Sequence, residues 1–84
     1  MYSEAISAES LDDLIHKLSM ALKELRESKM TIDILWDISQ NPNLKHELHS
    51  LSEETNELIS IFFASIKTCK EKKRLKTTQK DKNK

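Results

Sequence analysis

The sequence predicts an all-α fold, an antiparallel hairpin of two long helices that pack in the manner of a coiled coil. Apolar residues recur at alternating steps of three and four along most of the chain, which is the spacing of a helix face. Glycine is absent and Pro42 is the one proline among the 84 residues, so a helix must be interrupted at one place only. A chain of this size buries only about 60% of the surface that its unfolded form exposes. We therefore expect the hairpin to associate with itself or with a partner.

The hairpin is expected over residues 10–74, after a short flexible lead at 1–9. Ser10 can cap the first helix, residues 10–39, and Asp12 and Asp13 place negative charge in its first turn, where the helix dipole favours it. The predicted seam of this helix has seven apolar members among nine: Leu11, Leu14, Leu18, Ala21, Leu25, Ser28, Ile32, Leu35 and Ser39.

The corner is predicted at residues 40–42. Asn41 is a favoured helix N-cap, and Pro42 suits the first helical position because its missing N–H would have no intrahelical acceptor. The second helix is expected over residues 42–72, with an alternative in which it breaks near Ser50 and a third helix starts at Ser52. Its predicted seam is Leu44, Leu48, Leu51, Thr55, Leu58, Phe62, Ser65 and Cys69.

Folding at this corner predicts that residues whose numbers sum to about 80 to 83 lie at one level. Leu18 would then meet Phe62, and the polar seam residues Ser28 and Thr55 would share a layer. A buried polar layer can select one register at a cost in stability. Chance placement in a locally polar stretch explains the same pattern.

Charge divides the chain into an acidic body and a basic tail. Six basic and twelve acidic residues up to Cys69 give −6, and eight basic and two acidic residues from Lys70 onward give +6. Residues 75–84 have too little apolar content to order themselves, so we expect a disordered basic tail. Such a tail can attract nucleic acid or an anionic membrane surface without sequence preference, although it has no aromatic side chain to stack on bases. The alternative is a tail that only keeps the chain soluble and complements the helix dipole.

The residues that carry chemistry indicate no enzyme. His46 and His49 stand three apart, but two ligands without a third make no metal site. Cys69 falls on the predicted seam with no adjacent general base, and the lack of glycine excludes phosphate-cradling loops. We expect no cofactor, no metal and no catalytic residue.

A second apolar stripe beside the predicted seam is the candidate partner-binding site, because a two-helix seam does not need it. Its members are Ile15, Leu22 and Trp36 on the first helix and Ile59, Phe63 and Ile66 on the second. The occupant is either a second hairpin, which would close a four-helix bundle, or a different chain with a complementary helix or groove.

The cell compartment is predicted to be the cytoplasm. A single cysteine fits a reducing environment, no run approaches the roughly 18 apolar residues of a membrane span, and residues 1–9 are unlike a signal peptide.

Several short segments resemble the small helical-hairpin proteins of bacterial type III secretion systems. They are the Leu11-Asp12-Asp13 start, LSMALKEL at 18–25, the Asn41-Pro42 corner and the helix at 44–70. Needle subunits of that group end in an apolar helix packed into the filament, whereas this chain ends in lysines, so the resemblance favours the needle-subunit co-chaperones. Residues 52–59 also resemble the Ser-x-x-x-Asp helix of sporulation phosphatases, but Asn56 stands where that family needs Asp.

The sequence thus favours a non-enzymatic protein–protein interaction module, of the kind that the resemblance implies, a small cytoplasmic co-chaperone or adaptor of type III secretion. The alternative is a homodimeric four-helix-bundle regulator that binds nucleic acid through its basic tail.

Overall fold

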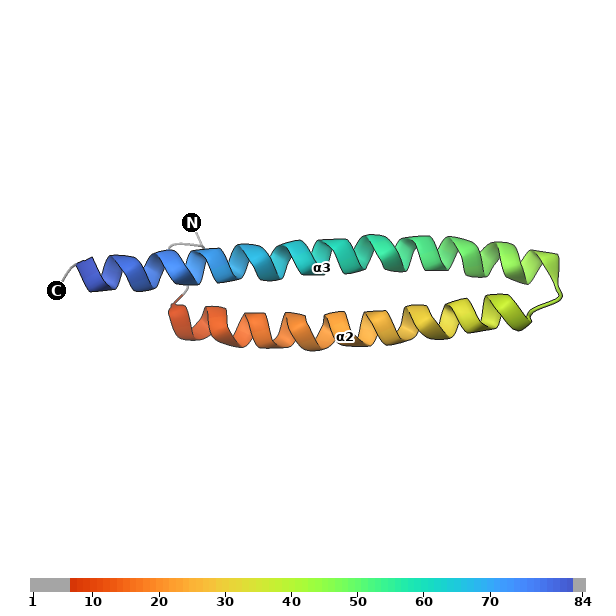
Figure 1. Ribbon diagram of the computed structural model, residues 1–84, viewed down its shortest axis with the longest axis horizontal. Coiled ribbons are helices and arrows are strands. Elements are labelled where there is room, and N and C mark those ends of the chain that lie inside the picture. Colours follow the sequence, from red (N-terminus) through yellow and green to blue (C-terminus); the bar gives the residue numbers. More distant parts are fainter. Residues whose placement is uncertain (1–6, 83–84) are drawn as a thin grey trace.

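The chain forms an all-α hairpin of two long antiparallel helices (Figure 1). The computed structural model describes residues 7–82, with side chains up to Lys76. Helix α2 spans Ala8–Ile38 and helix α3 spans Pro42–Lys82. No strand occurs in the described part of the chain, and none of its helices is long and apolar enough to cross a membrane.

The N-terminus of α2 lies one turn earlier than predicted. Ser7 is the N-cap, and its hydroxyl accepts a hydrogen bond from the backbone N–H of Ser10 at 3.1 Å. Ser10 therefore lies inside the helix instead of capping it. Of the predicted lead, residues 8 and 9 are helical, and residues 1–6 lie outside the described part.

The corner has the predicted chemistry. The side-chain oxygen of Asn41 accepts hydrogen bonds from the backbone N–H groups of Asn43 at 2.9 Å and Leu44 at 3.3 Å. Two of the N–H groups that a helix start leaves without partners are thereby satisfied. Ser39 is extended, with φ −74° and ψ 139°, and its N–H still donates to the carbonyl of Leu35.

Helix α3 is continuous from Pro42 to Lys82, without the alternative break near Ser50. It passes the predicted end at about Lys72 and includes residues 75–82, which we expected to be disordered. The physical reason is that no glycine or proline follows Pro42 to stop it, while the basic residues near its C-terminal end complement the negative end of the helix dipole. Residues 83 and 84 of the predicted tail lie outside the described part.

The register differs from the predicted one. Asp33 is hydrogen-bonded to Ser52, and Asp12 is paired with Lys73, so the residue numbers at one level sum to 85. The extended link lets α3 begin beyond the end of α2 (Figure 1), which moves the two helices past each other. Leu18 is consequently displaced from Phe62 by more than a helical turn.

The buried residues form a heptad seam that differs from the predicted one at every second position. Side chains at steps of four and three along α2 are buried or half-buried between the helices. They are Leu11, Ile15, Leu18, Leu22, Leu25, Lys29, Ile32 and Ser39, with Trp36 at the remaining step 40% exposed. On α3 the corresponding positions are Lys45, Leu48, Ser52, Thr55, Ile59, Phe62, Ile66, Cys69 and Lys73.

The predicted polar layer of Ser28 and Thr55 is wrong in one of its two members. Thr55 is buried, and its hydroxyl donates to the Leu51 carbonyl at 2.8 Å. Ser28 is exposed, and the seam position beside it belongs to Lys29. At this level each helix still has a polar residue in the seam: Lys29 on α2, where Ser28 was predicted, and Thr55 on α3.

Candidate partner-binding face

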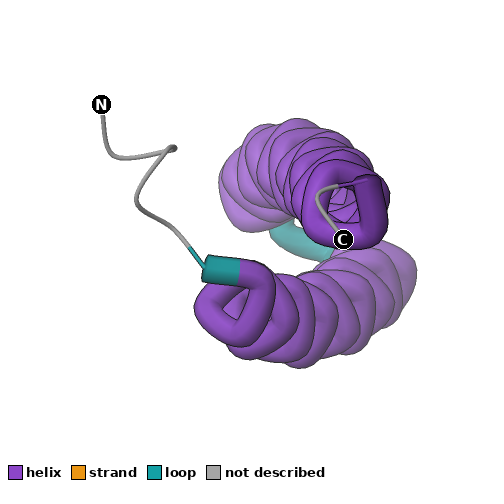
Figure 2. The backbone as a smooth tube through the Cα atoms, turned by 90° about the vertical axis from the view of Figure 1, so that its left-hand side faces the viewer, coloured by secondary structure: helices purple, strands orange, loops and turns teal. Residues whose placement is uncertain are grey.

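The two helices form a flat slab with two broad faces, and the heptad spacing assigns residues to each. Figure 2 shows the helices end on, side by side. Positions seven apart stay on one side of a coiled coil. One face, here called the open face, consists of Leu14, Ala21, Ser28, Leu35, Leu44, Leu51, Leu58, Ser65 and, at its far end, Lys72. The opposite face, here called the polar face, consists of Asp12, Ser19, Arg26, Asp33, His49, Asn56, Phe63 and Lys70.

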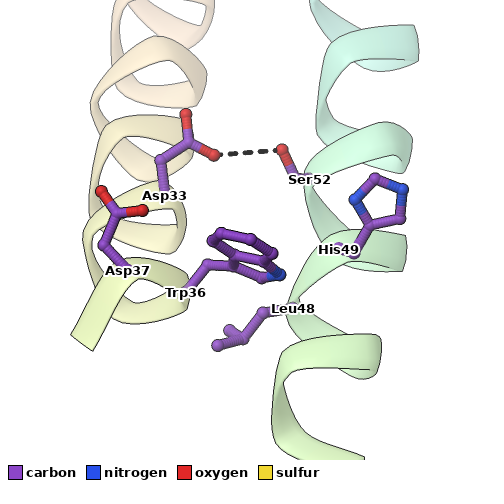
Figure 3. A pocket seen from close by; sticks show the side chains of 6 residues that line it. All are labelled: Asp33, Trp36, Asp37, Leu48, His49 and Ser52. Carbon is purple, nitrogen blue, oxygen red and sulfur yellow. Dashed lines mark hydrogen bonds between the residues drawn. The ribbon is translucent and has the colours of Figure 1, made fainter. Parts of the chain in front are cut away.

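Two grooves between the helices confirm this assignment. A groove of about 330 Å³ on the open face is lined by Ala21, Glu24, Leu25, Ser28, Leu58 and Phe62. Another of about 370 Å³ is lined by Asp33, Trp36, Asp37, Leu48, His49 and Ser52, which places polar-face residues of both helices together (Figure 3). On each helix, therefore, one side of the seam borders the open face and the other side borders the polar face.

Five leucines dominate the open face. Leu14, Leu35, Leu44, Leu51 and Leu58 are each between 40% and 47% exposed. Such similar values are expected of side chains that stand at the edge of a two-helix seam, where the other helix covers one flank and leaves the other in water. Scattered apolar residues on a surface are ordinary, but leucines at three consecutive heptad positions of α3, with Leu35 beside them on α2, are typical of a surface that a further chain covers.

The polar face is held by interactions between charged and polar side chains. The carboxylate of Asp33 accepts from the Lys29 ammonium at 2.9 Å and from the Ser52 hydroxyl at 3.2 Å, so it connects α2 to α3 (Figure 3). The hydrogen bond from Lys29 is the main reason that the pKa of Asp33 lies below its usual value; reduced solvation opposes it, and the charge of Lys29 and the Ser52 hydrogen bond add to the lowering. Asp12 and Lys73 form a second link at the other end of this face.

Trp36 lies on the polar-face side of the seam, near the corner. The Lys45 ammonium stands 3.8 Å from the centre of its ring, a cation–π arrangement between the two helices. The ring lines the groove with Leu48. At 40% exposure Trp36 is accessible, but its neighbours Asp33 and Asp37 are charged.

The six residues predicted to bind a partner are not gathered on one outer surface. Leu22 and Ile66 are buried within the hairpin, at 7% and 8% exposure, and Ile15 and Ile59 are half-buried in the same seam. These four stabilise the hairpin itself. Trp36 and Phe63 are exposed, Phe63 at 58%; Phe63 belongs to the polar face, and Trp36 stands at the edge of the seam on the same side. A partner-binding role for these two stays a prediction.

The sequence pattern does not identify the open-face leucines as a site, because it places them in the predicted inner seam. Leu44, Leu51 and Leu58 stand one position before Lys45, Ser52 and Ile59, which occupy the seam in their place. Both choices give alternating steps of three and four, and the choice with three leucines is the more apolar. On α3 near the corner the more polar choice, with Lys45 and Ser52, faces inward, and this leaves Leu44 and Leu51 available for another contact.

No family model, curated protein or solved structure matches this chain. The site is therefore interpreted from its own geometry. Among the described residues no three His, Cys, Asp or Glu side chains stand together in a way that could hold a metal ion. Cys69 is a buried seam residue with a free thiol, and His49 lies 3.6 Å from Glu53 on the surface of α3.

Proposed function

We propose that this chain is a non-enzymatic protein–protein interaction module that binds other helical chains through its open face. The observation that carries the proposal is the distribution of apolar residues between the two stripes. Lys45, Ser52 and Lys29 occupy the intramolecular seam, while leucines at heptad spacing stand outside it. A helix surface of this kind binds through evenly spaced apolar anchors that enter the groove of another chain.

Energy supports this interpretation. Burying a leucine side chain is worth about 1.5 to 3 kcal/mol when it was fully exposed, and roughly half of that when it is half-buried already. Five half-exposed leucines together then contribute on the order of 5 kcal/mol to an association. That is comparable to the whole stability of a small domain.

The finer assignment is a small cytoplasmic co-chaperone or adaptor of a type III secretion system. It is supported by the resemblance over residues 11–70, and the lysine-rich C-terminal end favours the co-chaperones over the needle subunits within that group. The hairpin shape and the basic C-terminal end are compatible with that group. Like the general proposal, this assignment requires that the open face be covered by another chain.

The experiment compares two variants of the tagged full chain in its native cell. Leu51→Glu/Leu58→Glu places charge on the open face, and Met30→Glu/Phe63→Glu makes the same change at residues that are more exposed, at 64% and 58%, and lie outside the open face. We expect chains recovered with the wild type, whether copies or other proteins, to be lost with the first variant and retained with the second. The proposal is contradicted if both variants recover the same chains as the wild type. It is also contradicted if these chains are lost only with Met30→Glu/Phe63→Glu.

A further inference from the structure

We infer that the open face binds a second copy of this chain, which closes a four-helix bundle with a two-fold axis along the hairpin. The inference deepens the proposed function and rests on it, because it names the occupant of the same face. Three properties of the molecule carry it: the area of the face, the distribution of side-chain size and apolarity along it, and the charges at its edges.

The area of the open face suits a stable dimer. The described chain measures 65 × 20 × 14 Å, so the two helices make a slab whose broad side is about 20 Å wide. Helix α2 has 31 residues and is therefore about 46 Å long. The overlapped part of the broad side is on the order of 900 Å², against about 800 Å² per partner in a stable protein–protein interface.

Side-chain sizes along the face are complementary in this arrangement. A two-fold axis along the hairpin lays α2 of one copy on α3 of the other, antiparallel and at the same level. With level partners summing to 85, Ser28 lies within one residue of the level of Leu58 of the second copy, and Leu35 lies within one residue of the level of its Leu51. The groove of about 330 Å³ beside Ala21 and Ser28 is open and can receive Leu58 of the second copy.

Apolar density also favours this axis. The half of the open face near the corner holds Leu35, Leu44, Leu51 and Leu58, and the other half holds small or polar residues with Leu14. An axis along the hairpin puts the leucine-rich halves together. An axis across the hairpin would lay each leucine-rich half on the other copy's half with Ala21 and Ser65, and would bury fewer apolar contacts.

The charges at the edges of the face are compatible with the axis along the hairpin. Glu24 of one copy lies level with Ile61 of the other, and Glu54 lies level with Thr31. An axis across the middle of the hairpin would instead place Glu24 beside Glu24 of the second copy, where like charges repel. The arrangement does bring the two basic ends to the same end of the bundle, but these exposed charges are screened beyond about 8 Å at physiological salt.

The first experiment measures the mass of the purified full chain by sedimentation at micromolar concentration. We expect twice the 9.8 kDa chain mass for the wild type and for Met30→Glu/Phe63→Glu, and a loss of dimer for Leu51→Glu/Leu58→Glu. Added salt should strengthen the dimer, since it screens the repulsion of the two basic ends. A monomeric wild type, or a dimer weakened by salt, overturns the inference.

The second experiment uses disulfides in the folded dimer and does not depend on a destabilising change. In a Cys69→Ala background, chains carrying Ser28→Cys are mixed with tagged chains carrying Leu58→Cys and oxidised. We expect a disulfide between the two different chains. Mixing Ala21→Cys with Ser28→Cys should give none, and a disulfide in that mixture would overturn the axis along the hairpin.

The two proposals fail separately. If the purified chain is a monomer, while the open-face variant still loses bound proteins in the native cell, the second copy is excluded and the interaction module stands. If neither the purified chain nor the native cell shows an effect of the open-face variant, both fail.

Discussion

The Asp33 carboxylate connects α2 to α3 in the half of the hairpin near the corner. It accepts hydrogen bonds from Lys29 on its own helix and from Ser52 on the other helix. Lys29 occupies a half-buried seam position, and its ammonium reaches the exposed carboxylate of Asp33 one turn further along α2. This group of three polar side chains favours one level of α2 against α3, because a slip by a heptad would separate Asp33 from Ser52.

The first prediction concerns the acid titration of Asp33. Its folded-state pKa lies below the unfolded value of about 3.9, first through the Lys29 hydrogen bond and less through Ser52. Its contribution to stability is therefore present above about pH 4 and is lost as pH falls through the folded pKa. Carboxyl NMR titration should give a pKa that rises toward the usual value in Lys29→Met and rises less in Ser52→Ala. An unchanged pKa in Lys29→Met would contradict the assigned cause.

The second prediction concerns the cap at Asn41. Its side-chain oxygen serves the N–H groups of Asn43 and Leu44, and alanine cannot replace it. Asn41→Ala should lower the free energy of unfolding by about 1 kcal/mol, measured by urea denaturation. Asn41→Asp is the matched control, since aspartate caps equally well. Equal losses in both variants would show that the amide group, and not the acceptor oxygen, is required.

Helix α3 is longer than the helix it packs against. With level partners summing to 85, Ala8 at the start of α2 stands level with residue 77, so the backbone beyond it extends past the hairpin. A segment without an antiparallel neighbour contributes little to stability, because most helical stability in proteins comes from packing of the apolar face.

The third prediction follows for the C-terminal end. Deleting residues 78–84 should leave the melting temperature nearly unchanged and reduce helicity by no more than the share of residues removed, as measured by circular dichroism. The comparison variant is a deletion of residues 75–84, because it also removes residues that lie at the level of the first turn of α2. A large loss of stability on the shorter deletion would show that these residues make contacts of their own.

Much of the element structure was predictable from the sequence, and the orientation of the stripes was not. The Asn41-Pro42 corner and the two helices follow from local signals, namely a cap, a proline and the apolar period. The identity of the stripe that faces inward does not follow from local signals. The predicted and observed stripes share Leu18, Leu25 and Phe62, differ by one residue at every second position, and have the same period. Which of them faces inward depends on how the two helices pack against each other along their whole length. The end of α3 was missed because low apolar content argued for disorder, whereas helix propensity and the absence of a stop signal favour continuation.

At the scale of the whole molecule, the hairpin has a small core. The described buried apolar set is Leu11, Leu22, Ile32, Leu48, Ile66 and Cys69. Domains with so few buried residues depend on additional constraints or on association. If a second copy supplies the remaining burial, folding and dimerisation are coupled, and stability depends on protein concentration.

The last prediction uses this coupling to separate the seam from the open face. Leu22 is buried in the seam, so Leu22→Ala opens a cavity and should cost about 2 to 5 kcal/mol, enough to unfold the chain at all accessible concentrations. Leu58→Ala removes a half-exposed side chain from the open face and should leave a helical hairpin whose melting temperature is lower. The wild type should melt at higher temperature as its concentration rises, and Leu58→Ala should show much less of this dependence. Concentration-independent melting of the wild type, combined with unfolding by Leu58→Ala as complete as that by Leu22→Ala, would assign Leu58 to the core of a self-sufficient hairpin.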